Sequence, residues 1–180
     1  MVPTGSPPPS LDGLVVLVVD ATTGLGRDLA ARLCAAGAIV AVVGAGHPDR
    51  GDDAATNAAF LCKALADRGL LALPYRIDVG DPDEAARLPG QIASDVGPPA
   101  AAVVVLPPPG ADEALVRAFR ALSAALAAAL PAGARHVEYA PTGGGPSPAG
   151  PGTSATAGDR VWVRSVVTAL AADAARAPSR

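Results

Sequence analysis

The sequence has a single lysine, Lys63, and very few aromatic side chains. Aromatic residues make up 3% of its 180 residues although 50% are hydrophobic, so Ala, Val and Leu must form the core. Small aliphatic side chains bury less apolar area than aromatic ones, and close packing of helices on a sheet has to compensate. The formal charge of −3 argues against a basic surface for nucleic acid. We therefore expect a globular protein with no nucleic-acid partner.

Cysteine clusters and long hydrophobic runs are also missing. Cys34 and Cys62 belong to no Cys/His cluster, which predicts two reduced, buried thiols and no metal site. No apolar run approaches the ~20 residues that cross a bilayer, and the Pro-rich start lacks the basic region of a signal peptide. We expect a soluble cytoplasmic protein without a membrane partner, with a disordered leader over residues 1–10 and one domain over residues 11–180.

The stretch from Gly13 to Arg27 organises the chain. A run rich in Val ends at a polar turn that begins at Asp20, and a helical leucine pattern follows directly. Strand, glycine-containing turn and helix in this order are typical of a dinucleotide-binding βα unit, whose glycines let a pyrophosphate approach the helix N-terminus. Gly24 and Gly26 supply the glycines, whereas Asp20 would turn a carboxylate toward the phosphates. The architecture is that of a dinucleotide site, but its first loop disfavours the ligand.

Strand-like and helix-like segments alternate five times along the chain. The apolar β-branched runs predict strands over residues 14–19, 38–43, 70–77, 101–106 and 134–139. Helices are expected from the first turn to about 36, over 53–68, from Pro82 to about 96, and over 111–130 and 159–175. Such alternation predicts a Rossmann-like, doubly wound parallel sheet of about five strands between two helical layers.

Several short motifs resemble those of the short-chain dehydrogenase/reductase (SDR) family. They are Leu11-Asp12-Gly13 before the first strand, Gly24-Leu25-Gly26 after it, Asp78-Val79 after the third strand and Gly110 after the fourth. The resemblance implies a Rossmann-like NAD(P)-dependent oxidoreductase, and the long loop after the second strand is most similar to the family's multifunctional-enzyme branch. It assigns the cofactor contacts to Gly24, Leu25, Gly26, Asp78, Val79 and Gly110.

The chain departs from the family where the reaction would take place. Asp20 replaces the first glycine of the phosphate loop, and the prolines at 107–109 replace Asn-Asn-Ala after the fourth strand. Thr142 is the only hydroxyl in the region where the catalytic Ser is expected. The YxxxK motif falls on the segment from Thr156 to Arg160. The resemblance therefore implies a degenerate member that lacks the Ser, Tyr and Lys of the family.

The missing Tyr–Lys pair removes the family's acid/base chemistry. That reaction needs a Tyr hydroxyl whose pKa is lowered by a lysine ammonium. An ordinary Tyr titrates near ~10 and an aliphatic hydroxyl far higher, so Thr156 cannot take over. No tyrosine follows Tyr139, Lys63 lies on the second helix, and a guanidinium at Arg160 does not replace lysine. We predict no catalytic residues, with Thr142, Thr156 and Arg160 in the altered positions, and weak NAD(P) binding or none.

Several residues have both a ligand-binding and a structural interpretation. Gly24 and Gly26 could contact a pyrophosphate or permit close packing of helix and strand, and Asp78 could bind an adenine or cap a loop. For His47 and Arg50 the alternatives are a 2′-phosphate contact and a solvated loop. His136 is interpreted as structural, Tyr139 as a passive hydroxyl near a strand end, and Trp162 as a core or interface anchor.

The two last helices suggest a partner. The segments 111–130 and 159–175 are apolar on more than one side, and the resemblance implies that they form a four-helix bundle with a second subunit. The first hypothesis is a non-catalytic SDR-like subunit paired with an active SDR relative, or a homodimer. The others are an NAD(P)-dependent oxidoreductase and a nucleotide-binding Rossmann-like module. The family would add further strands after Arg180, so the expected sheet is shortened at its C-terminal side; the substrate and the choice between NAD and NADP stay open.

Overall fold

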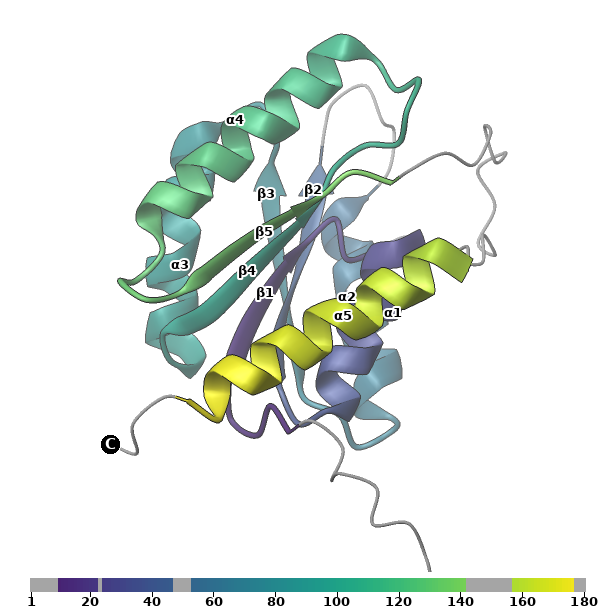
Figure 1. Ribbon diagram of the computed structural model, residues 1–180. Coiled ribbons are helices and arrows are strands. Elements are labelled where there is room, and N and C mark those ends of the chain that lie inside the picture. The colour runs from purple at the N-terminus through teal and green to yellow at the C-terminus, as the bar shows by residue number, and fades with distance from the viewer. Residues whose placement is uncertain (1–9, 23, 47–52, 142–156, 177–180) are drawn as a thin grey trace, which may run out of the picture.

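The computed structural model describes residues 10–22, 24–46, 53–141 and 157–176, with the side chains of 157–160 excepted. Strands and helices alternate along it (Figure 1). In chain order they are β1 (Val15–Val19), α1 (Gly24–Ala35), β2 (Ile39–Gly46), α2 (Ala54–Ala66), β3 (Ala72–Asp78), α3 (Pro82–Val96), β4 (Pro99–Val105), α4 (Glu113–Ala129), β5 (Arg135–Tyr139) and α5 (Ala157–Ala174).

The strands form one five-stranded sheet in the order β3-β2-β1-β4-β5, and every pairing is parallel. β1 lies at the centre, and all of its residues from Val15 to Val19 are buried. A continuous apolar strand of this kind is what a parallel sheet covered on both faces requires. The prediction of a Rossmann-like, doubly wound sheet is confirmed.

Helices cover both faces of the sheet (Figure 1). α1, α2 and α5 pack on one face, around residues such as Val16, Val40 and Val103. α3 and α4 pack on the other face, around Leu17, Val43 and their neighbours. α4 and α5 are therefore separated by the sheet, which differs from the side-by-side arrangement that the resemblance implied.

The alternation of side chains along β5 accounts for the face on which α5 lies. Val137 and Tyr139 point to the α1 side and pack against its core cluster, where the ring of Tyr139 also contacts Trp162 of α5. His136 and Glu138 point to the α4 side, where both side chains bond to Ser123. An apolar helix face gains more by covering the first pair than the second, because buried polar groups need hydrogen-bonding partners.

The helix starts are set by aspartates. Asp53, Asp81 and Asp112 each accept a hydrogen bond from a backbone N–H of the helix that follows, α2, α3 and α4 respectively. Pro82 is the first residue of α3, as the sequence predicted. The carboxylates satisfy N–H groups that would otherwise be available at these helix N-termini.

β2 is longer than predicted, because it continues through Gly44 to Gly46. A Cβ at position 44 would lie 2.1 Å from the carbonyl oxygen of Ala54, at the start of α2. The glycine that suggested a loop is required by this close approach of helix and strand. The rest of the predicted loop, 47–52, lies outside the described residues.

The two edges of the sheet differ in their capacity to pair with another strand. The N–H of Val40 bonds to the oxygen of Leu71, at 3.2 Å, so odd-numbered residues of β3 turn their backbone groups toward β2. Pro74 therefore faces the free edge, where its missing N–H removes a donor. β5 contains no proline, and its free edge keeps its donors.

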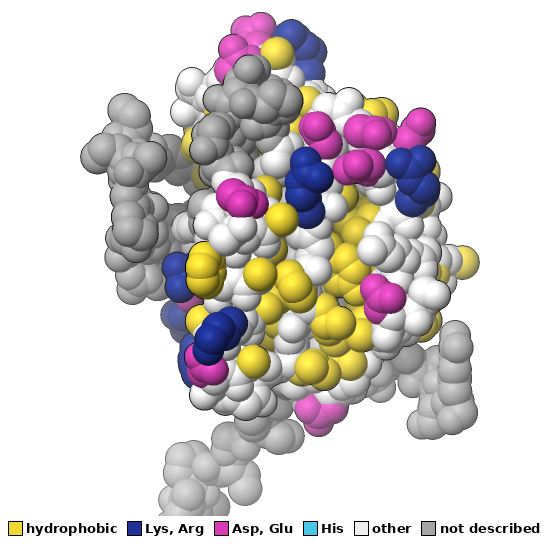
Figure 2. Space-filling view, turned by 180° about the vertical axis from the view of Figure 1, so that it is seen from behind, with side chains coloured by type: hydrophobic (Ala, Val, Ile, Leu, Met, Phe, Trp, Pro, Cys, Tyr) yellow, Lys and Arg dark blue, Asp and Glu magenta, His cyan; other side chains and the backbone are white. Residues whose placement is uncertain are grey.

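On the side of the molecule opposite β5, hydrophobic side chains gather in a patch with acidic and basic residues around it (Figure 2). Among the large hydrophobic side chains, Phe60 on α2 and Leu71 just before β3 are exposed, at 67% and 55%. Within the described residues, none of the helices combines the length and the hydrophobicity needed to cross a bilayer.

Both cysteines are free and buried, as predicted. Burial raises the pKa of Cys34 and of Cys62 to about 11. At about pH 8 only about one thiol in a thousand would be a thiolate. We expect no reaction of the folded protein with iodoacetamide and two adducts in concentrated guanidinium chloride, counted by mass spectrometry. Rapid double alkylation of the native protein would contradict this burial.

Candidate functional site

The candidate site is the crevice at the carboxyl ends of β1 and β4. The chain passes from β1 to β2 on one side and reaches β4 on the other side, which makes this the topological switch point of the sheet. In open α/β sheets ligands bind at such a point, between the loops that follow the two strands. Here those loops run from Asp20 to α1 and from Leu106 to α4.

The turn after β1 is tightly packed. Asp20 adopts a left-handed backbone conformation with φ of 58°, and Gly24 also has a positive φ, of 45°. A Cβ on Gly26 would lie 2.2 Å from the carbonyl oxygen of Asp20 and 2.9 Å from the Cα of Ala21. Gly26 is therefore required by packing of α1 against its own turn, which supports the structural interpretation. Leu25, assigned as a cofactor contact, is 8% exposed in the core.

Asp78 acts as a loop cap in this structure. Its Oδ1 accepts a hydrogen bond from the N–H of Gly80, at 2.8 Å. Its own N–H donates to Oε2 of Glu84, at 2.8 Å. Val79 is 1% exposed, and its N–H bonds to the oxygen of Gly46. The capping alternative for Asp78 is therefore what the geometry displays, while a contact with adenine remains a prediction.

The loop after β4 has few backbone donors for a ligand. Pro107, Pro108 and Pro109 have no N–H groups. Gly110 is exposed and has φ of 86°, so it serves a turn and no side chain approaches it closely. Asp112 then bonds to the N–H groups of Ala114 and Leu115, at 2.7 and 3.2 Å.

The structure describes only part of the positions where the family has its catalytic residues. Thr142 and Thr156 lie outside the described residues, and Arg160 lies within α5 without a described side chain. Lys63 is in the last turn of α2, which is the end remote from the crevice, and its Nζ pairs with Asp67 at 3.0 Å. The structure does not bring the one lysine of the chain to the strand ends.

The two tyrosines are both engaged elsewhere. The ring of Tyr139 stacks on Trp162 at 4.0 Å between centroids, tilted by 30°. Tyr75 on β3 donates to Oδ2 of Asp95, at 2.9 Å. Burial, with the hydrogen bond and charge of Asp95, raises the pKa of Tyr75 to about 12. A hydroxyl with that pKa does not serve as a base near neutral pH.

The raised pKa of Tyr75 has a consequence for stability. Between about pH 10 and pH 12 the native state keeps this proton and the unfolded chain loses it, so the free energy of unfolding falls as pH rises. We expect Tyr75→Phe to remove that part of the alkaline fall, although it also loses a hydrogen bond worth about 1 kcal/mol near neutral pH. Urea midpoints of both proteins across this range test the expectation. Parallel pH profiles would refute it.

Ser123 is a buried polar residue of α4 that sequence reasoning did not single out. It is completely buried on α4, donates to Oε1 of Glu138 at 2.5 Å and lies 2.9 Å from Nε2 of His136. Its signal in the sequence is a polar residue inside the apolar stripe of that helix. His136 is held in this cluster, in agreement with its structural interpretation.

The described residues contain no group of three or more metal-binding side chains. A cavity of about 710 Å³ lies beside the end of α1 and the middle of α5, lined by Asp12, Arg32 and Arg164 among others. It lies at the amino-terminal end of the strands, whereas the switch point is at their carboxyl ends.

Comparison with known proteins defines the fold. No protein-family model matches the chain, and no curated protein sequence is significantly similar to it. A hydroxysteroid dehydrogenase from Escherichia coli superposes with a TM-score of 0.54 at 22% identity, over 67% of this chain and 50% of that one. A putative D-mannonate oxidoreductase from Haemophilus influenza, solved with bound NAD, gives a TM-score of 0.45 at 19% identity, over 52% and 31%.

The fold is thus Rossmann-like and shared with a known dehydrogenase. The chain spans about half the length of that enzyme. At this level of identity the likeness extends to the fold and not to the activity.

Proposed function

We propose that the chain is a non-catalytic SDR-like subunit that acts by pairing with an active SDR-type dehydrogenase or ketoreductase. The observation that carries the proposal is the absence of a Tyr–Lys pair from the sequence. Its one lysine is Lys63, at the far end of α2, and no tyrosine follows Tyr139. A ketone cannot be reduced by the SDR mechanism without a proton donor of this kind.

The loops of the crevice support weak cofactor binding or none. Asp20 belongs to the turn that would hold a pyrophosphate, and an ionised carboxylate in that turn would repel the phosphates. Asp112 already occupies N–H groups at the start of α4. The three prolines before it have no backbone N–H groups that could bind a phosphate.

The contribution of Asp20 can be measured directly. We expect Asp20→Gly and Asp20→Asn each to strengthen NADH binding about tenfold, because each removes the negative charge. Asparagine and glycine both tolerate a left-handed conformation, so neither substitution should strain the turn. Titration of NADH followed by fluorescence tests this. Unchanged affinity in both variants would show that Asp20 does not repel the phosphates.

The outer side of α4 supports pairing. Ala121, Ala124 and Ala128 are exposed on it in helical spacing, and Arg117 and Arg120 lie beside them. Small side chains in this spacing let a second helix approach closely. Because α5 lies across the sheet, the partner would meet α4 by itself, and α5 would take part only through a separate contact.

The test is to express the tagged chain in its own cells, identify a co-purifying protein and reconstitute the pair. We expect an intact SDR with Ser, Tyr and Lys whose stability or turnover depends on this chain. Ala124→Glu should abolish the association, whereas Ala55→Glu on the exposed side of α2 should not. If the chain alone reduces carbonyl substrates with NADH or NADPH, the proposal fails and the oxidoreductase hypothesis holds. If it binds NAD(P) without turnover and has no partner, it is a nucleotide-binding module.

A further inference from the structure

The outer edge of β5 has backbone N–H and C=O groups that can pair with another strand. The N–H of Leu106 bonds to the oxygen of Tyr139, at 2.8 Å, so odd-numbered residues of β5 turn their backbone groups toward β4. In a parallel ladder the alternate residues face away. His136 and Glu138 therefore direct their N–H and C=O groups outward from the sheet. No residue in the described part of the chain pairs with them there.

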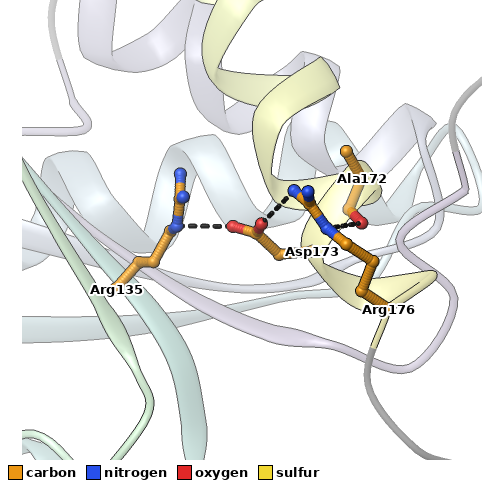
Figure 3. Close-up of polar contacts among 4 residues, drawn as sticks. All are labelled: Arg135, Ala172, Asp173 and Arg176. Carbon is orange, nitrogen blue, oxygen red and sulfur yellow. Dashed lines mark hydrogen bonds and ion pairs between the residues drawn. The ribbon is translucent and has the colours of Figure 1, made fainter.

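Both faces of the strand hold its side chains in place. On the α4 side, Ser123 bonds to His136 and to one oxygen of Glu138. On the α5 side, Arg135 forms an ion pair with Asp173, which also binds Arg176 (Figure 3). The edge is thus ordered before any partner arrives, which lowers the entropy cost of association.

The sequence of β5 is complementary to itself in one antiparallel register. If the two-fold axis passes through Val137, then His136 stands opposite Glu138 of the second copy, and Arg135 stands opposite Tyr139. The outward-facing residues then meet as hydrogen-bonded pairs, as an antiparallel ladder requires. An axis at position 138 would place Glu138 opposite itself, and an axis at 136 would do the same for His136. Only the register centred on 137 places an imidazole, which can donate a hydrogen bond, opposite a carboxylate.

We propose that β5 pairs antiparallel with β5 of a second copy of this chain, centred on Val137, to form one sheet continuous across both subunits. A two-fold interface of this kind is self-complementary and closed. The other edge cannot do this equally well, because Pro74 interrupts its outward donors. The inference does not depend on the proposed function, since it needs neither a cofactor nor an active relative.

Sedimentation equilibrium of the isolated protein over a micromolar concentration series tests the proposal. We expect a reversible dimer, and a dissociation constant at least tenfold higher for Glu138→Lys, which removes the carboxylate opposite His136 at both places where the two residues meet in the dimer. Adding His136→Glu to that variant should restore the affinity, because a carboxylate at position 136 then stands opposite the lysine at position 138. Glu113→Lys, at an exposed site on α4, should have no effect. A wild-type monomer at these concentrations would overturn the proposal.

The register is tested by cross-linking. Directly opposed residues at a non-hydrogen-bonded position have Cα atoms close enough for a disulfide, at about 4.5 Å. Val137→Cys should therefore give a covalent dimer on mild oxidation. Arg135→Cys should not, because its counterpart in the second copy lies opposite residue 139. A dimer cross-linked by Arg135→Cys and not by Val137→Cys, or by neither, would overturn the register centred on 137.

Discussion

We expect Gly26→Ala to lower the free energy of unfolding by about 3 kcal/mol. The added Cβ would lie 2.2 Å from the carbonyl oxygen of Asp20 and 2.9 Å from the Cα of Ala21. Both are backbone atoms of a tight turn, so neither can rotate away as the end of a flexible side chain could. Relief requires α1 to shift off the end of β1. Urea denaturation followed by circular dichroism gives the size of the effect.

Gly90→Ala is the matched control, since Gly90 also lies inside a helix. It is exposed on α3, and nothing lies within 4 Å of the position its Cβ would take. Alanine should stabilise this helix by up to about 1 kcal/mol. If both substitutions changed stability alike, the packing argument for Gly26 would be wrong. If Gly26→Ala left stability intact and only weakened NADH binding, the glycine would serve the ligand.

The order of the elements could be predicted from the sequence because two strong local signals coincide. Short β-branched runs such as Val15–Val19 alternate with helices whose starts are marked by aspartate, as at Asp81. The error at the end of β2 has a tertiary cause. Gly44 and Gly46 have the composition of a loop, but the approach of Ala54 requires glycine inside a strand.

The candidate site was less predictable than the fold. Sequence motifs placed Gly26 and Asp78 near the strand ends correctly, but could not decide between ligand contact and packing. That decision depends on distances, such as the one from Gly26 to the Asp20 carbonyl, and on the hydrogen bond from Gly80 to Asp78. Ser123 was missed because its partners, on β5, are defined only once α4 covers the sheet.

The resemblance did not predict the face of the sheet on which α5 packs, although the alternation of polar and apolar residues along β5 indicates that face. Family likeness favoured α4 and α5 as neighbours. The alternation from Arg135 to Tyr139 instead puts the apolar side chains of β5 on the α1 side and its polar pair on the α4 side. The apolar face of a helix packs against the face of the strand that carries apolar side chains. The chemistry of one edge strand thereby separates the two helices that the resemblance would place together.

The second large effect concerns this docking of α5. We expect Val163→Asp to cost about 4 kcal/mol or more, because Val163 is completely buried against the α1 layer and an unpaired carboxylate there has no partner. Trp162 is the only tryptophan of the chain, and its emission should move to longer wavelength as α5 detaches. Val161→Asp is the control, because Val161 is 61% exposed on the same helix. It should change stability by less than about 0.5 kcal/mol.

The fluorescence of Trp162 also shows on which face of the sheet α5 packs. Tyr139 stacks on Trp162 only if α5 lies on the α1 side, because the side chain of Tyr139 points to that side of β5. Tyr139→Leu should therefore alter the emission of Trp162 in the folded protein. Glu138→Gln, one residue away and directed to the α4 side, should leave it unchanged. If Glu138→Gln changed the emission and Tyr139→Leu did not, α5 would lie beside α4. The two helices could then form one surface for a partner.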